Sequence, residues 1–389
     1  MKLVLVANAR IPSQRAQSVQ LMHTASAFHR AGAAVTLLTA DRRKKVALPD
    51  GQDVFTYYGI PADARPKLET APCTDWVDGV PVLLQYFPAR IQELTFARNA
   101  AKQVLERHTH SLVYSREIES ARHLVKRGLE RVFLELHRVP GSDTRRRWLR
   151  EAARGVRGVV AISGGVREDL IALGVEPAKI RVEHDALDPQ RFRRPPDRDV
   201  ARDELSLPKR GPVVVYTGGL LAWKGADLLI DAARKLPAVQ FVIAGGMDKD
   251  VERLKLLAHD LANFRVDGFQ APTRVPLYLA AADVTVVPNR SEPLISAKYT
   301  SPLKIFEAMA LGVPIVASDL PSIREILEHE RDAVLVPPDS ADTLAAGIER
   351  LLGDAALRAR LRARLLERAP DNTWEARARR LLAWMEAAA

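Results

Sequence analysis

The stretch from Lys298 to Leu327 has the sequence KYTSPLKIFEAMALGVPIVASDLPSIREIL. Its pattern predicts a loop, a helix, a tight turn, a buried strand at Val313–Ser318 and a second helix. Ser301 is placed to cap the first helix, and Pro302 fits the first turn of that helix. Gly312 is typical of a helix end. A helix start that lies beside the end of a strand is a common phosphate-binding arrangement, so this segment is the first candidate for a site.

Length and composition set the broad class of the protein. A chain of 389 residues exceeds one ordinary hydrophobic core and indicates two domains. A single cysteine, Cys73, excludes an intrachain disulfide and favours a reducing compartment. The apolar run Leu3–Ala7 is too short for a signal peptide, and no run approaches the roughly 20 apolar residues of a membrane span. We therefore expect a cytoplasmic protein.

Positive charge is concentrated in one segment of the chain. The formal net charge is +10, and arginines crowd residues 145–157, where apolar residues lie among them. Such a helix can present a solvated face, rest on an anionic bilayer or bind nucleic acid. Aromatic residues make up only 6% of the chain, which argues against a base-stacking surface. The solvated face and the inner surface of a membrane stay open, and no nucleic-acid partner is expected.

Apolar runs alternate with helical patterns along the whole chain, which predicts parallel sheets and an α/β fold. The expected strands are Lys2–Ala7, Val35–Thr39, Leu112–Tyr114, Val132–Leu136, Gly158–Ile162, Val213–Tyr216, Phe241–Ala244, Val284–Val287 and Ile315–Ala317, and one more strand is expected at the end of Leu170–Ala186, after a helix end and a turn. A polar, proline-bearing stretch near 193–212 marks the domain boundary. We expect a Rossmann-like domain at 1–195, a linker at 196–211 and a second Rossmann-like domain at 212–370. Ligands in such sheets bind beyond the carboxyl ends of the strands, which favours the cleft between the domains.

The turn after the predicted strand Val213–Tyr216 carries paired glycines. Gly218 and Gly219 would let a phosphate approach the backbone closely, and Lys224 would neutralise it. The spacing matches neither a Walker loop nor the GxGxxG fingerprint. An ordinary strand–helix turn with a solvated lysine is the alternative interpretation.

Four other side chains are candidates. Glu307 lies in an apolar helix, where it could grip ribose hydroxyls or form an exposed ion pair with Lys304 three residues earlier. His137 follows a predicted strand and could donate a hydrogen bond to a sugar, or it could be a satisfied loop histidine. Arg10 and Arg15 could contact a phosphate or an anionic acceptor, or remain surface arginines.

Metal chemistry has little support in the sequence. No His/Cys cluster has zinc spacing, and the DxD-like triplet Asp197–Asp199 falls in the expected linker. We therefore expect neither a metal nor a cofactor.

Taken together, these segments resemble the GT-B glycosyltransferases, specifically the large retaining family 4. The resemblance covers almost the whole chain and is carried by YTGGLLAWKGADLLIDAA from Tyr216, ADVTVVPN from Ala282, SPLKIFEAMALGVP from Ser301 and VVAISGGVREDLIALG from Val159. It implies two Rossmann-like domains that face each other across a cleft, with the acceptor side first and the donor side second. It also implies that a terminal helix within 371–389 crosses back to the first domain.

The resemblance assigns roles to individual residues. Glu307 matches the glutamate that binds the donor ribose, Lys224 the lysine on the donor diphosphate, and His137 a histidine near the reacting carbon. The other implied donor contacts are Thr300, Ser301, Pro302, Leu303 and Lys304 near the phosphates, and Gly245, Gly268 and Phe269 at the base pocket. Tyr299 and Gly219 stand where the family has a glutamate and an arginine. These departures affect the contacts expected for the sugar and the diphosphate.

The implied activity is a retaining transfer of a hexose-type sugar from a nucleotide diphosphate to a hydroxyl acceptor, which would be a sugar or a lipid-linked molecule. Cell-envelope, polysaccharide or small-molecule glycoside synthesis would use such a reaction. The nucleotide sugar would be a substrate, and no metal is implied. Two alternatives stay open: a nucleotide-sugar epimerase or phosphorylase of the same fold, and a non-catalytic nucleotide-sugar-binding protein.

Overall fold

The computed structural model describes residues 1–13, 16–43, 47–48 and 50–388 of the chain. The chain forms two compact units. The first unit comprises Met1–Ile162, Val166–Glu183 and Trp374–Ala389, and the second comprises Ser163–Gly165 and His184–Thr373. The stretch that was expected to be a linker, residues 196–211, lies inside the second unit and contains a helix, Arg198–Glu204.

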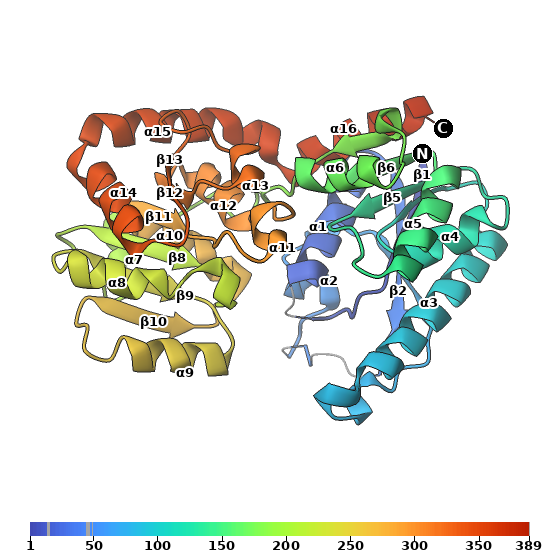
Figure 1. Ribbon diagram of the computed structural model, residues 1–389, viewed down its shortest axis with the longest axis horizontal. Helices are drawn as coiled ribbons and strands as arrows, with labels where there is room; N and C mark the ends of the chain where they lie inside the picture. Colours follow the sequence, from blue (N-terminus) through green and yellow to red (C-terminus); the bar gives the residue numbers. More distant parts are fainter. Residues whose placement is uncertain (14–15, 44–46, 49, 389) are drawn as a thin grey trace. The chain divides into compact units, whose positions relative to one another are not determined.

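The first unit is built on a parallel sheet (Figure 1). In chain order its strands are β1 (Lys2–Ala7), β2 (Ala34–Asp41), β3 (Lys67–Pro72), β4 (Leu112–Ser115), β5 (Val132–Leu136), β6 (Gly158–Ala161) and β7 (Ile180–Val182). They lie side by side in the order β3-β2-β1-β4-β5-β6-β7. Strand β1 pairs in register with β2 on one side and with β4 on the other, so the strand order reverses between β1 and β4.

Helices pack on both faces of the first sheet. They are α1 (Ala16–Arg30), α2 (Val54–Tyr57), α3 (Tyr86–Arg107), α4 (Ile118–Val125), α5 (Asp143–Gly155), α6 (Gly164–Ala172) and α16 (Trp374–Ala388). Helix α3 packs on α4, α4 packs on α5, and α16 packs on α1. Arg30 of α1 forms an ion pair with Glu375 of α16, so the last helix of the chain is part of the first unit.

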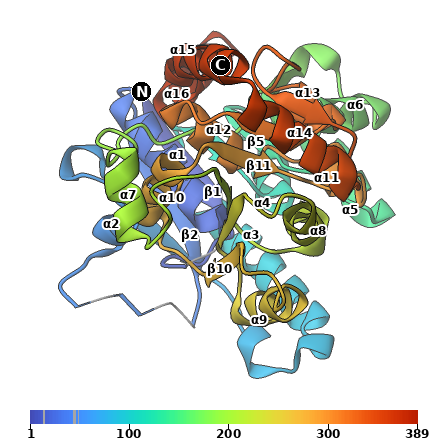
Figure 2. The ribbon, with the colours of Figure 1, turned by 90° about the vertical axis from the view of Figure 1, so that its left-hand side faces the viewer.

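The second unit repeats the architecture with a smaller sheet. Its strands are β8 (Val213–Thr217), β9 (Gln240–Ala244), β10 (Phe264–Gly268), β11 (Val284–Val287), β12 (Ile315–Ser318) and β13 (Val334–Val336), in the parallel order β10-β9-β8-β11-β12-β13. Its helices are α7 (Arg198–Glu204), α8 (Leu228–Lys235), α9 (Asp248–Leu257), α10 (Val275–Ala281), α11 (Leu294–Ala297), α12 (Leu303–Leu311), α13 (Pro321–Arg324), α14 (Ala341–Gly353) and α15 (Ala355–Arg368). Figure 2 shows α8, α9 and α14 on one side of this sheet and α10 on the other.

Both units are Rossmann-like, as the alternating pattern predicts. The strands that sequence reasoning found are those with continuous apolar runs, and β1, β5 and β11 begin and end where the pattern places them. Three strands were not predicted. Strand β3 is a partly exposed edge strand with a charged sequence, β10 contains two charged residues, and β13 has only three residues.

Candidate functional site

In the turn after β8, the backbone of the second unit is exposed at Gly218 and partly exposed at Gly219. Gly218 has a φ of +121° and donates its N–H to the Ala244 carbonyl at 2.9 Å. This backbone conformation favours glycine because a side chain would be strained there. The Tyr216 hydroxyl donates a hydrogen bond to the Gly219 carbonyl at 2.7 Å, which helps to fix the conformation of the turn.

Two lysine ammonium groups lie over this turn. A Cβ placed on Gly218 would lie 3.8 Å from Lys304 Nζ, and one placed on Gly219 would lie 3.6 Å from Lys224 Nζ. Lys224 comes from the end of a short 3₁₀ helix, Ala222–Lys224, and Lys304 from the first turn of α12. Two parts of the chain that are 80 positions apart therefore place positive charge at one turn.

Lys304 is buried, and its ammonium has no hydrogen-bonding partner within the part of the chain that the structure describes. Its residue exposure is 8%, and no described residue offers Nζ a hydrogen bond. The ammonium instead lies 3.5 Å from the centroid of the Tyr216 ring, a cation–π contact. Helix spacing made Glu307 a candidate partner, but no ion pair joins Lys304 to Glu307 among the described residues.

The electrostatics of the turn favour an anion. Burial, together with the neighbouring Lys224 ammonium, holds the pKa of Lys304 well below its usual value, although Glu307 opposes this shift. Burial also lowers the pKa of Lys224. Two partly desolvated ammonium groups are costly unless a negative charge joins them. A diphosphate would supply that charge and two sets of acceptor oxygens.

Glu307 has a partner that sequence reasoning missed. Its carboxylate forms an ion pair with the guanidinium of Arg191, and the two side chains are only 14% and 13% exposed. Arg191 lies 116 positions earlier, in a polar stretch after Asp188, and its Cζ is 5.3 Å from the centroid of the Phe192 ring. The ion pair uses Oε1 of Glu307, so Oε2 is the oxygen that could meet a ribose hydroxyl.

The start of α12 differs from the predicted cap. Pro302 is the N-cap residue, and its side chain makes no capping hydrogen bond. Ser301 Oγ instead accepts a hydrogen bond from the Asp185 N–H at 2.8 Å, so the prediction that Ser301 caps the helix is wrong. Gly312 ends the helix with a φ of +62°, as predicted. Tyr299 and Thr300 precede the helix and Leu303 is its first residue, and all three are partly buried.

The expected base-pocket residues meet at neighbouring strand ends. Gly245 follows β9 and donates its N–H to the Gly268 carbonyl at 2.6 Å. A Cβ on Gly245 would lie 2.2 Å from the Gly218 carbonyl oxygen, so only glycine fits there. Phe269, the residue after β10, is about half exposed. The structure thus gathers Gly218, Gly219, Lys224, Gly245, Gly268 and Lys304 around one edge of the second sheet.

His137 belongs to the first unit, where it follows β5. Its Nε2 lies 2.8 Å from Glu135 Oε1 and also contacts Arg116. Glu135 is buried and is paired with Arg116 at 3.1 Å and with Arg377 of α16 at 2.8 Å. Burial alone would raise the pKa of Glu135, but Arg377, Arg116 and His137 outweigh it and hold this pKa well below its usual value. The imidazole is therefore held by a charged network.

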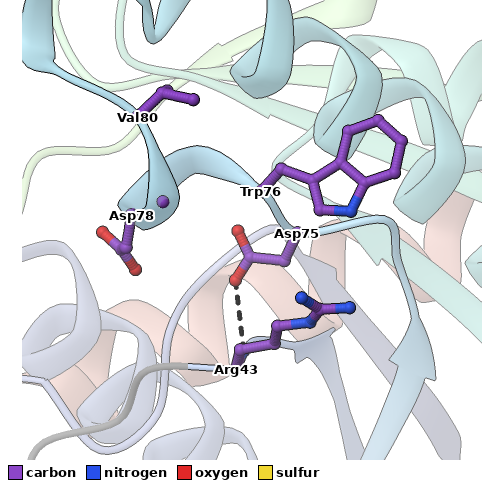
Figure 3. Close-up of a pocket in the computed structure, with 6 residues that line it drawn as sticks. Arg43, Asp75, Trp76, Asp78 and Val80 are labelled. Atoms are coloured by element: carbon purple, nitrogen blue, oxygen red, sulfur yellow. Dashed lines mark hydrogen bonds between the residues drawn. The ribbon is translucent and has the colours of Figure 1, made fainter.

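Arg10 forms an ion pair with a residue that lines a pocket of the first unit. Its guanidinium pairs with Asp78, which lines a cavity of about 380 Å³ together with Arg43, Asp75, Trp76, Gly79 and Val80. The Arg43 N–H donates to the Asp75 carboxylate at 3.1 Å, as Figure 3 shows. Arg10 thus has an acidic partner, and Arg15 lies outside the described residues.

Helix α5 carries the predicted basic segment, but its apolar residues face the protein. Leu149, Ala152 and Ala153 are buried, and Trp148 lies within 5.7 Å of the guanidinium of Arg90 and 5.3 Å of that of Arg122. The expected membrane face of α5 therefore offers charge but no apolar side chains. The exposed arginines without an ion pair among the described residues include Arg147, Arg150 and Arg154.

Exposed apolar side chains gather instead at the start of α3. Leu83 is 94% exposed, and its exposed neighbours complete a cluster that we call the apolar tip: Leu83, Leu84, Tyr86, Phe87 and Ile91. Figure 1 shows this start of α3 extending beyond the strands of its unit. Arg90 links the tip to α5, because it contacts Trp148 and shares Glu119 with Arg145.

Within the described ranges, no group of three or more His, Cys, Asp or Glu side chains is arranged to hold a metal ion. In the same part of the chain, no helix combines the length and the apolar character needed to cross a bilayer.

Comparison with known proteins decides the family. Residues 17–191 match the profile described as Glycosyltransferase Family 4, and residues 197–368 match the one described as Glycosyl transferases group 1. The crystal structure of Anabaena HepE in complex with UDP superposes with a TM-score of 0.75 at 18% identity, covering 100% of both chains. The chain belongs to the GT-B glycosyltransferases of the family 4 type. A sucrose-phosphate synthase from Thermosynechococcus elongatus shares the same GT-B fold, with a TM-score of 0.74, 22% identity and 100% coverage of both chains.

The curated relatives are similar over part of their length. A D-inositol 3-phosphate glycosyltransferase of Catenulispora acidiphila is 32% identical over 241 residues, which are 58% of this chain and 56% of that protein. The alpha-D-kanosaminyltransferase of Streptomyces kanamyceticus is 31% identical over 166 residues, or 41% of each chain. The chain thus spans about half the length of the curated relatives it matches.

Proposed function

We propose that the chain is a retaining glycosyltransferase that moves a hexose-type sugar from a nucleotide diphosphate donor to a hydroxyl acceptor. The observation that carries the proposal is the pair of ammonium groups over the Gly218–Gly219 turn, one of which is buried and has no hydrogen bond to any described residue. The pair suits a diphosphate that leaves with its negative charge. Family membership supports the same reaction class.

The proposed step needs no metal. The acceptor oxygen bonds to the anomeric carbon on the face that the diphosphate leaves. As the carbon–oxygen bond breaks, the leaving phosphate keeps the electron pair and accepts the hydroxyl proton. Lys224, Lys304 and the backbone N–H groups at the start of α12 would stabilise the departing charge.

The ribose would be held by Glu307 in this proposal. Its carboxylate is mostly buried, and the ion pair with Arg191 fixes its orientation. A carboxylate oxygen that accepts two vicinal hydroxyls explains why a charged residue lies in so apolar a helix. Tyr299 would supply a hydroxyl where the family has a charged sugar contact.

The test combines binding with turnover. A thermal-shift panel of uridine, guanosine and adenosine diphosphate sugars should show stabilisation by one base, about 2.7 kcal/mol at 100 times the dissociation constant. Uridine donors come first, because HepE was solved with UDP and with UDP-glucose. Lys224→Ala and Glu307→Ala should lose this shift and the transfer of sugar. Lys249→Ala and Glu252→Ala, at exposed positions on α9, serve as matched controls.

Three outcomes separate the alternatives. Unchanged binding and transfer in both site variants would reject the assignment. Conversion of the donor without any acceptor would indicate an epimerase. Nucleotide binding without turnover across an acceptor panel would indicate a binding protein.

The acceptor would come from a membrane surface in this proposal. The apolar tip offers side chains that can enter the interface of a bilayer, and the exposed arginines of α5 favour anionic lipid. The tip and α5 are joined through Arg90, so one surface of the first unit carries both features. Location at the inner face of a membrane is part of the same proposal.

A further inference from the structure

Glu117 occupies the point of the first sheet where the strand order reverses. It follows β4, whose neighbour is β1, and the connections from these two strands leave in opposite directions along the sheet. Ligands of doubly wound sheets bind outside the carboxyl ends of the strands at such a point. The residues that follow the neighbouring strands are Asn8 after β1 and His137 after β5.

The carboxylate of Glu117 is held in place by neutral groups. Its Oε1 accepts the Asn8 N–H at 3.0 Å. Its backbone is fixed by Ser115, whose Oγ accepts the Glu117 N–H at 3.1 Å and donates to the Glu117 carbonyl at 2.9 Å. The Asn8 side chain is fixed in turn by paired amide hydrogen bonds with Gln92 of α3, at 3.0 and 2.8 Å. A carboxylate held so firmly can orient a ligand.

Among the described residues, no cation forms an ion pair with the carboxylate of Glu117. Arg116, the adjacent residue, directs its guanidinium to Glu135 and His137 instead. Arg90 of α3 pairs with Glu93 and Glu119, two carboxylates whose charge acts on Glu117. Within the described chain, the only hydrogen bond to the Glu117 carboxylate comes from Asn8, and it goes to Oε1. A half-buried carboxylate with one unused oxygen suits an uncharged hydroxyl donor better than a phosphate.

We infer that Glu117 binds the acceptor, with Oε2 accepting a hydrogen bond from a hydroxyl of a neutral polyol such as a pyranose or a cyclitol. The inference rests on the proposed function, because it places the acceptor at the first sheet. It also separates two tasks: Glu307 holds hydroxyls of the donor, and Glu117 holds a hydroxyl of the acceptor.

The ionisation of Glu117 supplies a second readout. Burial, together with the negative charges of Glu119 and Glu93, raises the pKa of Glu117 to about 7. The hydrogen bond from the Asn8 N–H and the charge of Arg116 act in the opposite direction. The ionised carboxylate is the better hydrogen-bond acceptor. Binding of the polyol should therefore strengthen as the pH rises through about 7.

The experiment measures acceptor binding without nucleotide. Ligand-observed NMR of the full chain with a panel of neutral pyranoses and cyclitols gives the dissociation constants, and Glu117→Gln keeps an oxygen for the Asn8 N–H. The variant should weaken binding about tenfold or more and lose the pH dependence between pH 6 and 8. Glu106→Gln, at an exposed position of α3, is the matched control.

Donor binding keeps the two proposals distinguishable. The thermal shift with UDP-glucose should be the same in Glu117→Gln and in the unmodified chain. Loss of that shift in the variant alone would assign Glu117 to the donor or to folding and overturn the inference. Equal polyol affinity in both proteins, or no binding of any panel member to the unmodified chain, would also overturn it, whatever the donor results show.

Discussion

At the residue level, Lys304 faces a different partner from the one that helix spacing predicts. Glu307 lies three residues further along α12, yet Lys304 lies over the Tyr216 ring and Glu307 pairs with Arg191. Both side chains were recognisable as candidates because charges within an apolar helix are unusual. Arg191 was not recognisable as a site residue, because an arginine in a polar stretch gives no periodic signal and its partner Glu307 is 116 positions away.

Replacing Lys304 should separate stability from binding. A buried ammonium without a hydrogen bond destabilises the nucleotide-free protein, so Lys304→Met should raise its melting temperature by about 1–4 °C. The same variant should lose most of the stabilisation by a nucleotide sugar. Differential scanning calorimetry with and without the donor checks both effects, with Lys249→Met as the control. A lower melting temperature without nucleotide would show that the contact with Tyr216 stabilises the fold.

The ion pair between Arg191 and Glu307 should affect recognition of the ribose. If Arg191 orients the carboxylate, Arg191→Gln weakens UDP binding about tenfold, which corresponds to about 1.4 kcal/mol. It should also reduce the preference for UDP over 2′-deoxyuridine diphosphate, as Glu307→Ala should. Titration calorimetry with both nucleotides measures the preference. Arg193→Gln, an exposed neighbour, should leave it intact, and an unchanged preference in Arg191→Gln would exclude the orienting role.

At the level of elements, α12 shows what a sequence pattern can and cannot predict. Its end at Gly312 follows from local chemistry, since a residue with positive φ closes the helix. Its start does not follow from local chemistry, because the Ser301 hydroxyl accepts a hydrogen bond from the Asp185 N–H, 116 positions earlier in the chain, instead of capping the helix. The same contrast separates the continuous apolar strands, which were predicted, from β3, β10 and β13, whose sequences are charged or short.

The end of α12 should be sensitive to an added methyl group. Gly312 has a φ of +62°, and a Cβ there would lie 2.8 Å from the Leu366 side chain. Gly312→Ala should therefore lower the free energy of unfolding by about 1–3 kcal/mol. Urea denaturation followed by circular dichroism measures the change. Gly353→Ala, at a position with open space around it, is the control and should be close to neutral.

At the level of the whole molecule, the alternation of strands and helices was enough to predict two Rossmann-like units. The chain path between them could not be read from composition. A proline-rich stretch suggested a linker at 196–211, but these residues form α7 and its surroundings, where Arg202 is buried and pairs with Asp283. Ser163–Gly165 belongs to the second unit although its neighbours in sequence belong to the first. Such crossings depend on tertiary contacts, for which local sequence carries no signal.

Docking of the whole molecule to a membrane should need both the apolar tip and the arginines of α5. Leu83→Ser combined with Phe87→Ser should reduce sedimentation with vesicles of anionic lipid at every salt concentration, because both side chains are largely exposed. Arg147→Gln combined with Arg150→Gln should reduce it chiefly at low salt. Leu256→Ser, at an exposed apolar position on α9, is the control. No sedimentation of the unmodified chain at low salt would reject the docking surface.

The place of α16 has a consequence for synthesis on the ribosome. The first unit emerges early, but the helix that supplies Arg377 to its buried Glu135 is made only after His184–Thr373. At about 5–20 residues per second, that interval lasts on the order of 10–40 s. During this time Glu135 keeps Arg116 but lacks the guanidinium of Arg377. Completion of the first unit therefore waits for synthesis of the second, and loss of Trp374–Ala388 would damage a unit whose other residues are made before the second.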